Sequence, residues 1–388
     1  MAEYSFLTTL FFLSSGLFLG WSLGANDAAN IFGTAVSTKM IKFKSAAIIA
    51  SIFIILGAVT GGSGTSSTLE SLGAIGSLPA AFVVALSAAF TVYIMTKSAI
   101  PVSTSQSIVG SIIGWNIFVG LNINFEVVYK IILSWILSPV FAAIFSFIIF
   151  FVIKKILDNS KIHLLRVDYY TRLGLIIVGA FGAYSLGANN IANVVGVFMK
   201  TIPLNEIKFL GIFSISSSQQ LFFLGSAAIA LGVITYSKRV MNTVGNRIFK
   251  LSPLTAFVVV FSCSLVLFLF ASKDLKIFLN SHGLPSFPLV PISSSQAIVG
   301  SIIGVSFAKN AKNLKLKIMG KISMGWLITP VMSAIIAFVM LFFMQNVFMQ
   351  DVDKVYNNRQ SKKNNLIIDK SENLCKNSIN KIKGANND

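Results

Sequence analysis

Charged residues are scarce in this chain of 388 residues, and their scarcity excludes a soluble globular protein of ordinary composition. Asp, Glu, Lys and Arg together make up 11% of the sequence, whereas hydrophobic residues make up 55%. Soluble domains contain about 25% charged and roughly 45–50% apolar residues. The composition therefore predicts a membrane protein with no separate soluble domain of ordinary size.

Cysteine and histidine are nearly absent, and this excludes several kinds of catalytic and metal site. Cys263 lies in an apolar run and Cys375 in a polar tail, so the two cysteines offer neither a disulfide framework nor a metal-binding spacing. His163 and His282 lie far apart in predicted loops. The apolar segments contain no nucleophile–base pair and no cluster of metal-ligating side chains. We expect a protein that is not an enzyme and has no cofactor.

Long apolar runs dominate the chain in place of charge. A bilayer core needs about 20 apolar residues, or fewer where a segment is broken or re-entrant. The sequence thus predicts an all-α polytopic membrane protein with about 10–12 transmembrane segments, some of them broken or re-entrant. The first segment is expected to be broken by a polar motif. The segments are 6–38, 45–61, 79–96, 103–120 and 131–153 in the first half, and 173–199, 209–235, 253–272, 286–308 and 322–349 in the second.

Lys and Arg are concentrated in alternate loops between these segments. Lys39, Lys42 and Lys44 follow the first segment and five lysines lie between residues 309 and 321, whereas residues 62–78 contain neither Lys nor Arg. This asymmetry assigns the basic loops to the cytoplasm. It also accounts for the net charge of +18 without a nucleic-acid partner.

The order of the segments predicts how the chain is divided. Residues 1–153 are expected to form a first membrane repeat, 154–172 a basic cytoplasmic linker, 173–349 a second membrane repeat and 350–388 a polar tail with a disordered composition. Five crossings per repeat would turn the second repeat upside down relative to the first, so we expect inverted repeats. This deduction fails if the segments at 103–120 and 286–308 re-enter instead of crossing.

Each half contains a proline followed by hydroxyl groups, a glutamine and a glycine-containing apolar run. The copies begin at Pro101 and Pro291, and both contain Ser-Gln-x-Ile-Val-Gly. Proline suits a helix start, and a helix that starts inside the membrane offers free N–H groups to an anion. Two such ends would surround a tetrahedral oxyanion; the alternative is that these residues serve only helix packing. The candidate anion-binding residues are Ser103, Thr104, Ser105, Gln106, Ser293, Ser294, Ser295 and Gln296.

A second repeated phrase, Gly-Ala-Asn, begins at Gly24 and again at Gly187. In the first copy Asp27 lies between Asn26 and Asn30 within apolar sequence. An ionisable side chain is costly there and is a functional candidate by default. Carboxylate, amide and backbone carbonyl oxygens suit Na⁺. Asp27 could instead carry a coupling proton, accept a hydrogen bond from a protonated oxyanion, or lie at a helix end in the membrane interface.

Together the two pairs of phrases resemble the duplicated signature of the inorganic phosphate transporter family, over roughly residues 5–349. Members of this family are secondary symporters driven by Na⁺ or H⁺, and some relatives move sulfate. The resemblance implies an inverted-repeat fold with broken helices and a phosphate site, flanked by cation sites, where the repeats meet. It assigns the two hydroxyl phrases and Asp27 to phosphate. It assigns to cations Asn26, Asp27, Asn30, Asn189, Asn190 and Asn193.

One position departs from the family pattern, because Asn190 stands where the phrase usually has a second Asp. Phosphate near neutral pH carries a P–OH group that needs an acceptor, and Asp27 remains for that role. Sulfate has no such proton and suits a site with fewer acceptors. We expect a multi-pass plasma-membrane protein that imports phosphate by Na⁺ or H⁺ symport through alternating access. The alternatives are a sulfate permease of the same fold, an anion channel and a membrane-embedded enzyme; a homodimer is one possible assembly.

Two further features are less specific. Residues 61–70 resemble a phosphate-cradling loop but lack the lysine of a P-loop, so we expect an external turn in which Glu70 could line the entry. Lys97 lies shortly before Ser103. We expect it to be a cytoplasmic anchor, with attraction of anions as the alternative.

Overall fold

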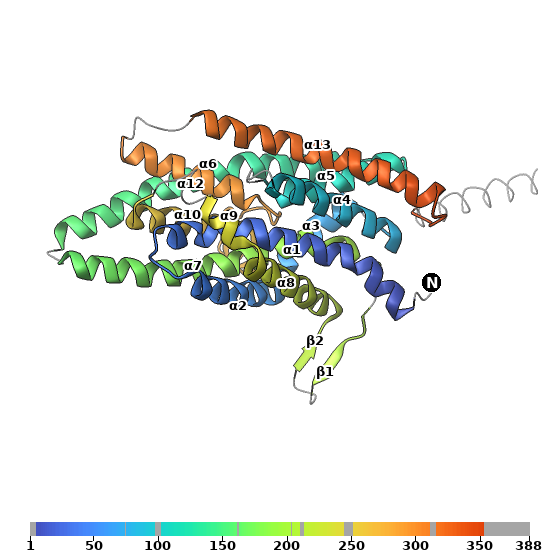
Figure 1. Ribbon diagram of the computed structural model, residues 1–388, viewed down its shortest axis with the longest axis horizontal. Coiled ribbons are helices and arrows are strands. Elements are labelled where there is room, and N and C mark those ends of the chain that lie inside the picture. The colour runs from blue at the N-terminus through green and yellow to red at the C-terminus, as the bar shows by residue number, and fades with distance from the viewer. Residues whose placement is uncertain are drawn as a thin grey trace, which may run out of the picture.

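The computed structural model describes residues 5–73, 75–97, 102–160, 163–202, 204–209, 213–243, 251–310 and 316–352, nearly all of them helical (Figure 1). The first half contains α1 (Phe6–Ser37), α2 (Phe43–Gly61), α3 (Ser63–Leu72), α4 (Leu78–Lys97), α5 (Thr104–Phe118) and α6 (Phe125–Asn159). The second half contains α7 (Leu164–Val195), the 3₁₀-helix η1 (Gly196–Phe198), strands β1 (Ile207–Phe209) and β2 (Phe213–Ile215), α8 (Ser217–Thr235), α9 (Ser237–Thr243), α10 (Pro253–Ala271), α11 (Lys273–Ser281), α12 (Ser294–Ala308) and α13 (Leu316–Asn346).

Eight of the described helices are long and apolar enough to cross a membrane: α1, α2, α4, α6, α7, α8, α10 and α13. The predicted all-helical, multi-pass membrane fold is therefore confirmed. In the most apolar stretch of α6, only 22% of the residues are buried inside the protein, and the fraction is the same in α13. These two helices present wide apolar faces, as helices do that contact lipid.

The segments predicted at 103–120 and 286–308 form short helices. α5 and α12 have 15 residues each. A helix of that length spans about 22 Å, less than the roughly 30 Å of a hydrocarbon core. α4 and α5 are antiparallel, because Ser77 before α4 and Trp115 near the end of α5 bind the adjacent residues Asp351 and Val352. α4 and α5 therefore form a hairpin that enters and leaves at the same end of the molecule.

α1 and α7 run without a break through the Gly-Ala-Asn phrases, so the predicted break in the first segment is wrong. Close packing takes its place. A Cβ on Gly24 would overlap the carbonyl group of Ile229 in α8, and a Cβ on Gly187 would overlap that of Ile54 in α2. Glycine lets helix backbones approach each other in this way at membrane interfaces. The two phrases thus lie within intact helices that pack against the other half of the chain.

The predicted helix starts at the hydroxyl phrases are confirmed. Ser103 and Ser293 are the N-cap residues of α5 and α12. Each side-chain oxygen accepts a hydrogen bond, at 3.2 Å, from the backbone N–H of the glutamine three residues later. This satisfies one of the N–H groups that a helix start leaves unpaired.

The short helices α5 and α12 each pack against the long helix that ends the other half, so the halves are interleaved. α13 lies beside α5 along one long side of the molecule (Figure 1). The two glycines of each GxxxG motif lie at these contacts, because a Cβ added to any of the four would overlap the backbone of the facing helix. The four contacts join Gly110 to Pro330, Gly114 to Ala334, Gly300 to Pro139 and Gly304 to Ala143.

Two stretches differ from their predicted structure. The expected external turn at 61–70 is instead the end of α2 followed by α3, whose Leu69 and Leu72 are buried. Helix α3 packs against α7, and Glu70 at its end forms an ion pair with Lys200, 2.8 Å between Nζ and Oε1. The predicted segment 209–235 begins as the β1–β2 hairpin, since a capping box at Ser216 starts α8 only at residue 217.

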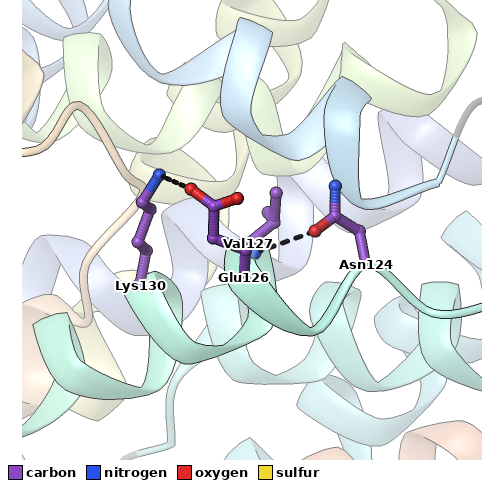
Figure 2. A network of polar contacts seen from close by, with 4 residues as sticks. All are labelled: Asn124, Glu126, Val127 and Lys130. Atoms are coloured by element: carbon purple, nitrogen blue, oxygen red, sulfur yellow. Dashed lines mark hydrogen bonds and ion pairs between the residues drawn. The ribbon is translucent and has the colours of Figure 1, made fainter.

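Helices also extend into the predicted linker at 154–172, since α6 continues to Asn159 and α7 begins at Leu164. α6 begins at a capped end, shown in Figure 2: Asn124 Oδ1 accepts a hydrogen bond from the Val127 N–H at 3.3 Å. Lys130 pairs with Glu126 at 2.6 Å on the same exposed turn. The predicted tail lies outside the described residues from 353 onward.

Gly300→Ala should destabilise the protein, because the new Cβ would overlap the Pro139 carbonyl group and push α12 away from α6. Overpacking of this kind costs about 1–3 kcal/mol, against the roughly 1 kcal/mol by which Ala favours a helix over Gly. Thermal unfolding in detergent measures the effect. Gly320→Ala in α13 is the matched control, since no heavy atom lies within 4 Å of its added Cβ. Equal unfolding temperatures for the two variants would contradict the close contact.

Candidate functional site

The site predicted from the sequence is buried where the second half of α1 and the end of α7 meet the starts of α5 and α12. Every predicted residue is buried, and Gln296 has the largest exposed fraction, 6%. Uncompensated polar groups are costly in such a position. The buried residues are Asn26, Asp27, Asn30, Ser103, Thr104, Ser105, Gln106, Asn189, Asn190, Asn193, Ser293, Ser294, Ser295 and Gln296.

The first Gly-Ala-Asn phrase binds the second hydroxyl phrase. Ser294 Oγ donates a hydrogen bond to Asp27 Oδ2 at 3.0 Å and accepts one from Asn30 Nδ2 at 3.0 Å. Asn26 Nδ2 donates to Asp27 Oδ1 at 2.9 Å. Each carboxylate oxygen of Asp27 therefore accepts a hydrogen bond, which compensates part of the cost of burying it.

The second Gly-Ala-Asn phrase binds the first hydroxyl phrase in the same manner. Asn193 Nδ2 donates hydrogen bonds to Ser105 Oγ and to Asn190 Oδ1, both at 2.9 Å. Ser105 Oγ lies 3.1 Å from the Ile292 carbonyl oxygen and 3.4 Å from Asn190 Oδ1. The pairing of the asparagine and serine side chains between the halves is thus reciprocal, since Asn30 binds Ser294 and Asn193 binds Ser105.

Two backbone carbonyl groups complete the network. Asn26 Nδ2 donates to the Val102 carbonyl oxygen at 3.2 Å, and Ser105 Oγ contacts the carbonyl oxygen of Ile292. Both carbonyl groups belong to the residue directly before an N-cap serine. They bring the starts of α5 and α12 into one cluster with α1 and α7. Sequence reasoning missed both residues because an apolar side chain gives no sign that its carbonyl oxygen is used.

The starts of α5 and α12 supply N–H donors to this cluster. The first N–H groups of a helix have no intrahelical acceptor, and the helix dipole adds partial positive charge. Only one N–H of each start, that of Gln106 or Gln296, is bonded to a side chain in the described structure. The arrangement can hold an oxyanion between two helix ends without a buried cation.

Several buried polar atoms of the site have no hydrogen-bond partner among the described residues, and such atoms are candidates to bind a ligand, an ion or water. Most of these unpaired atoms belong to the side-chain amides of the second Gly-Ala-Asn phrase. No side-chain atom of the first phrase is among them. Oxygen atoms of this kind fit Na⁺ and amide or hydroxyl donors fit an oxyanion. The atoms are Thr104 Oγ1, Gln106 Oε1, Asn189 Oδ1 and Nδ2, Asn190 Nδ2, Asn193 Oδ1 and Gln296 Oε1.

Two features lie next to this cluster. Cys263 Sγ is 3.9 Å from the Ser294 carbonyl oxygen, so this buried thiol, which the sequence did not single out, touches the start of α12. A crevice too narrow to hold a water molecule lies against α1, one turn before Asn26. Lys97 borders it, which is compatible with either predicted role of this lysine. The crevice is lined by Trp21, Ser22, Ala25, Tyr93, Thr96, Lys97 and Tyr236.

Comparison with known proteins identifies one protein family and several related transporters. A model of the phosphate transporter family matches residues 23–277 and 283–381. A Methanocaldococcus jannaschii protein, provisionally named a phosphate permease, is 29% identical over 322 residues, 83% of this chain and 93% of that protein. The sulfate permease CysP of Bacillus subtilis is 29% identical over 334 residues, 84% of this chain and 85% of that protein. A solved structure of a sodium-dependent phosphate transporter aligns with a TM-score of 0.69 and 25% identity, covering 86% of this chain and 99% of that one.

The reciprocal pairing predicts energetic coupling between Asn30 and Ser294. A double-mutant cycle of Asn30→Ala and Ser294→Ala, read by thermal unfolding, should give a coupling of about 1 kcal/mol for their hydrogen bond. Asn30→Ala with Ser107→Ala is the control, because within the described residues the Ser107 hydroxyl group bonds to Ala88 and Ser333 and not to the Asn30–Ser294 pair. Its effects should add within about 0.5 kcal/mol. A coupling energy between Asn30 and Ser294 that is no larger than that of the control pair would refute the hydrogen bond between them.

Proposed function

Because this chain belongs to the phosphate transporter family, we propose that it imports inorganic phosphate by symport with Na⁺ or H⁺. It is a multi-pass membrane protein, and a provisionally named phosphate permease is among its relatives. We assign it to the plasma membrane. Transport, and not catalysis, is the activity in the proposal, with the cluster of α1, α5, α7 and α12 as the substrate site.

The observation that carries the proposal is the reciprocal network around Asp27 and Ser105. Ser294 joins the first phrase to α12, and Asn193 joins the second phrase to α5. A site built from both halves can open first to one side and then to the other if the halves move relative to each other. In the proposal the halves are the membrane repeats 1–153 and 173–349, related by inversion, with 154–172 as a cytoplasmic linker and 350–388 as a tail.

Inversion of the repeats is supported by the ends of the long helices. α13 and α6, the last helices of the two halves, end at opposite ends of the molecule (Figure 1). The α4–α5 hairpin contributes two passes that cancel, so it does not disturb the parity argued from the sequence. An inverted pair lets one conformational change close the site on one side while it opens the other.

The roles within the site follow from the chemistry of each group. The hydroxyl groups of residues 103–105 and 293–295, with the helix N–H groups and the amides of Gln106 and Gln296, donate to phosphate oxygens. Asp27 accepts the phosphate P–OH proton or carries coupling charge. The amide oxygens of Asn26, Asn30, Asn189, Asn190 and Asn193 bind the coupling cation. The solved relative is sodium-dependent, which favours Na⁺ as that cation.

Sulfate is the second candidate substrate, on one specific observation. Asn190 contributes an amide to the second half of the site where Asp27 contributes a carboxylate to the first. An amide Nδ2 donor suits the unprotonated oxygens of sulfate, and Asn190 Nδ2 has no hydrogen-bond partner among the residues that the structure describes. The sulfate permease CysP shares 29% of the aligned residues.

Asp27→Asn should reduce gradient-driven phosphate uptake into proteoliposomes to background, because the site would lose its buried carboxylate. Uptake is measured with an imposed Na⁺ gradient, and separately with a proton gradient in Na⁺-free buffer. Asp168→Asn is the matched control, since Asp168 is exposed and forms a surface ion pair with Arg172 at 3.5 Å. Normal uptake by the Asp27 variant would refute the assigned role. If the anion inside the proteoliposomes never accumulates beyond its electrochemical equilibrium, the protein is a channel and not a symporter.

Asn190→Asp should shift selectivity from sulfate toward phosphate. The new carboxylate could accept the P–OH hydrogen bond but would repel sulfate. A charged hydrogen bond of about 1.5 kcal/mol corresponds to roughly tenfold in relative affinity. Competition of unlabelled sulfate and phosphate against labelled phosphate uptake measures the ratio. Asn280→Asp, at an exposed position in α11, is the control for added charge. An unchanged ratio would remove Asn190 from substrate discrimination.

A further inference from the structure

A cavity lies far from the substrate cluster, at the end of the molecule where α6 ends. It has a volume of about 460 Å³. The end of α6, the start of α10 and the end of α12 enclose it, and we call it the α6 cleft. Two lysines and one aspartate border it. Its lining consists of Phe150, Lys154, Leu157, Asp158, Ser252, Leu254, Thr255, Ala308, Lys309 and Asn310.

The internal repeat gives this cleft a counterpart in the other half. Ala-Phe-Val-Val occurs at 81–84 and at 256–259, which matches Ser77 before α4 with Ser252 before α10. Ser-Ile-Ile-Gly occurs at 111–114 and at 301–304, which matches α5 with α12. The matched turns after these helices share a left-handed residue, Gly120 with φ 68° and Asn310 with φ 50°. The counterpart therefore lies between the end of α13, the start of α4 and the end of α5.

The counterpart is filled by the chain itself. After α13 the backbone folds back, Ser77 Oγ donates to the Asp351 carbonyl oxygen at 2.6 Å, and Trp115 Nε1 donates to that of Val352 at 3.2 Å. The Val352 side chain is buried there. After α6 the chain instead goes on to α7, and no described segment takes the equivalent place in the α6 cleft. One cleft is thus filled by a segment of the chain itself, and the other is left open by the described residues.

The chemistry of the open cleft indicates its occupant. Lys154 and Lys309 face it from α6 and α12, against the single carboxylate of Asp158. The start of α10, a helix of 19 residues, adds the positive end of its dipole. Directly beside the lining, Phe151 of α6 and Phe307 of α12 are 45% and 63% exposed. Cationic groups at the end of membrane helices next to exposed aromatic rings match an anionic headgroup with attached acyl chains.

We propose that the α6 cleft binds the phosphate-bearing headgroup of an anionic phospholipid, with the acyl chains along the exposed faces of α6 and α12. The lipid takes the place that Asp351 and Val352 occupy in the counterpart. It links α10 and α12 of the second half to α6, the last helix of the first half, as Ser77 and Trp115 link α4 and α5 to the segment after α13. This role is separate from the substrate site.

The test uses the full-length protein in neutral detergent, with thermal unfolding followed during titration with phosphatidylglycerol or phosphatidylcholine. Phosphatidylglycerol should raise the unfolding temperature and phosphatidylcholine should not. Lys154→Gln with Lys309→Gln should weaken the apparent affinity for phosphatidylglycerol by about fivefold or more. Each lysine near an anionic lipid contributes about 1 kcal/mol of binding free energy, which corresponds to roughly fivefold in affinity. Lys44→Gln with Lys155→Gln removes the same charge from exposed positions outside the lining and should leave the affinity unchanged.

Further arms separate the sources of the signal. Asp158→Asn should strengthen phosphatidylglycerol binding, because it removes the opposing charge from the cleft. Equal loss in the cleft and control double variants would overturn the proposal, as it would indicate a general surface charge effect. Equal stabilisation by phosphatidylcholine would also overturn it. If inorganic phosphate alone gives the same stabilisation and the lysine substitutions abolish it, the cleft binds a soluble anion and the lipid proposal is overturned.

Discussion

The buried hydrogen bonds of Ser294 with Asp27 and Asn30 are the constraint on which the rest of the structure depends. A carboxylate inside an apolar bundle must be compensated, and here one of its two donors comes from the other half of the chain. Ser105 and Asn193 repeat the arrangement in reverse. Because each phrase has hydrogen-bond partners in the opposite half, burial of either polar phrase draws on both halves. The polar network therefore imposes the interleaving.

Interleaving in turn requires helices to approach closely, and glycine provides this. Gly24 and Gly187 let α1 and α7 lie against the backbones of α8 and α2. Gly300 and Gly304 do the same for α12 against α6. In a membrane, packing at this distance replaces the hydrophobic driving force that lipid does not supply. The same glycines that looked like helix breakers in α1 and α7 are contact points within continuous helices.

The two halves are alike in architecture but unequal in chemistry. One polar cluster contains the carboxylate of Asp27, whereas its counterpart contains Asn190 and several amide atoms without partners. One cleft beside the last helix is filled by Val352, whereas the other is open and bordered by Lys154 and Lys309. The proposed roles in substrate, cation and lipid binding rest on these differences.

The sequence by itself determined the membrane class, the positions of the long helices and the helix starts at Ser103 and Ser293, because hydropathy and capping are local properties. It also identified the buried polar residues, since a polar phrase in apolar sequence is conspicuous wherever it folds. Only the tertiary structure decided that Asp27 meets Ser294 of the other half, that the carbonyl groups of Val102 and Ile292 take part, and that one of two equivalent clefts is left open by the described residues. These facts depend on contacts between residues far apart in the chain, and no local pattern encodes which copy of a repeat will pair with which.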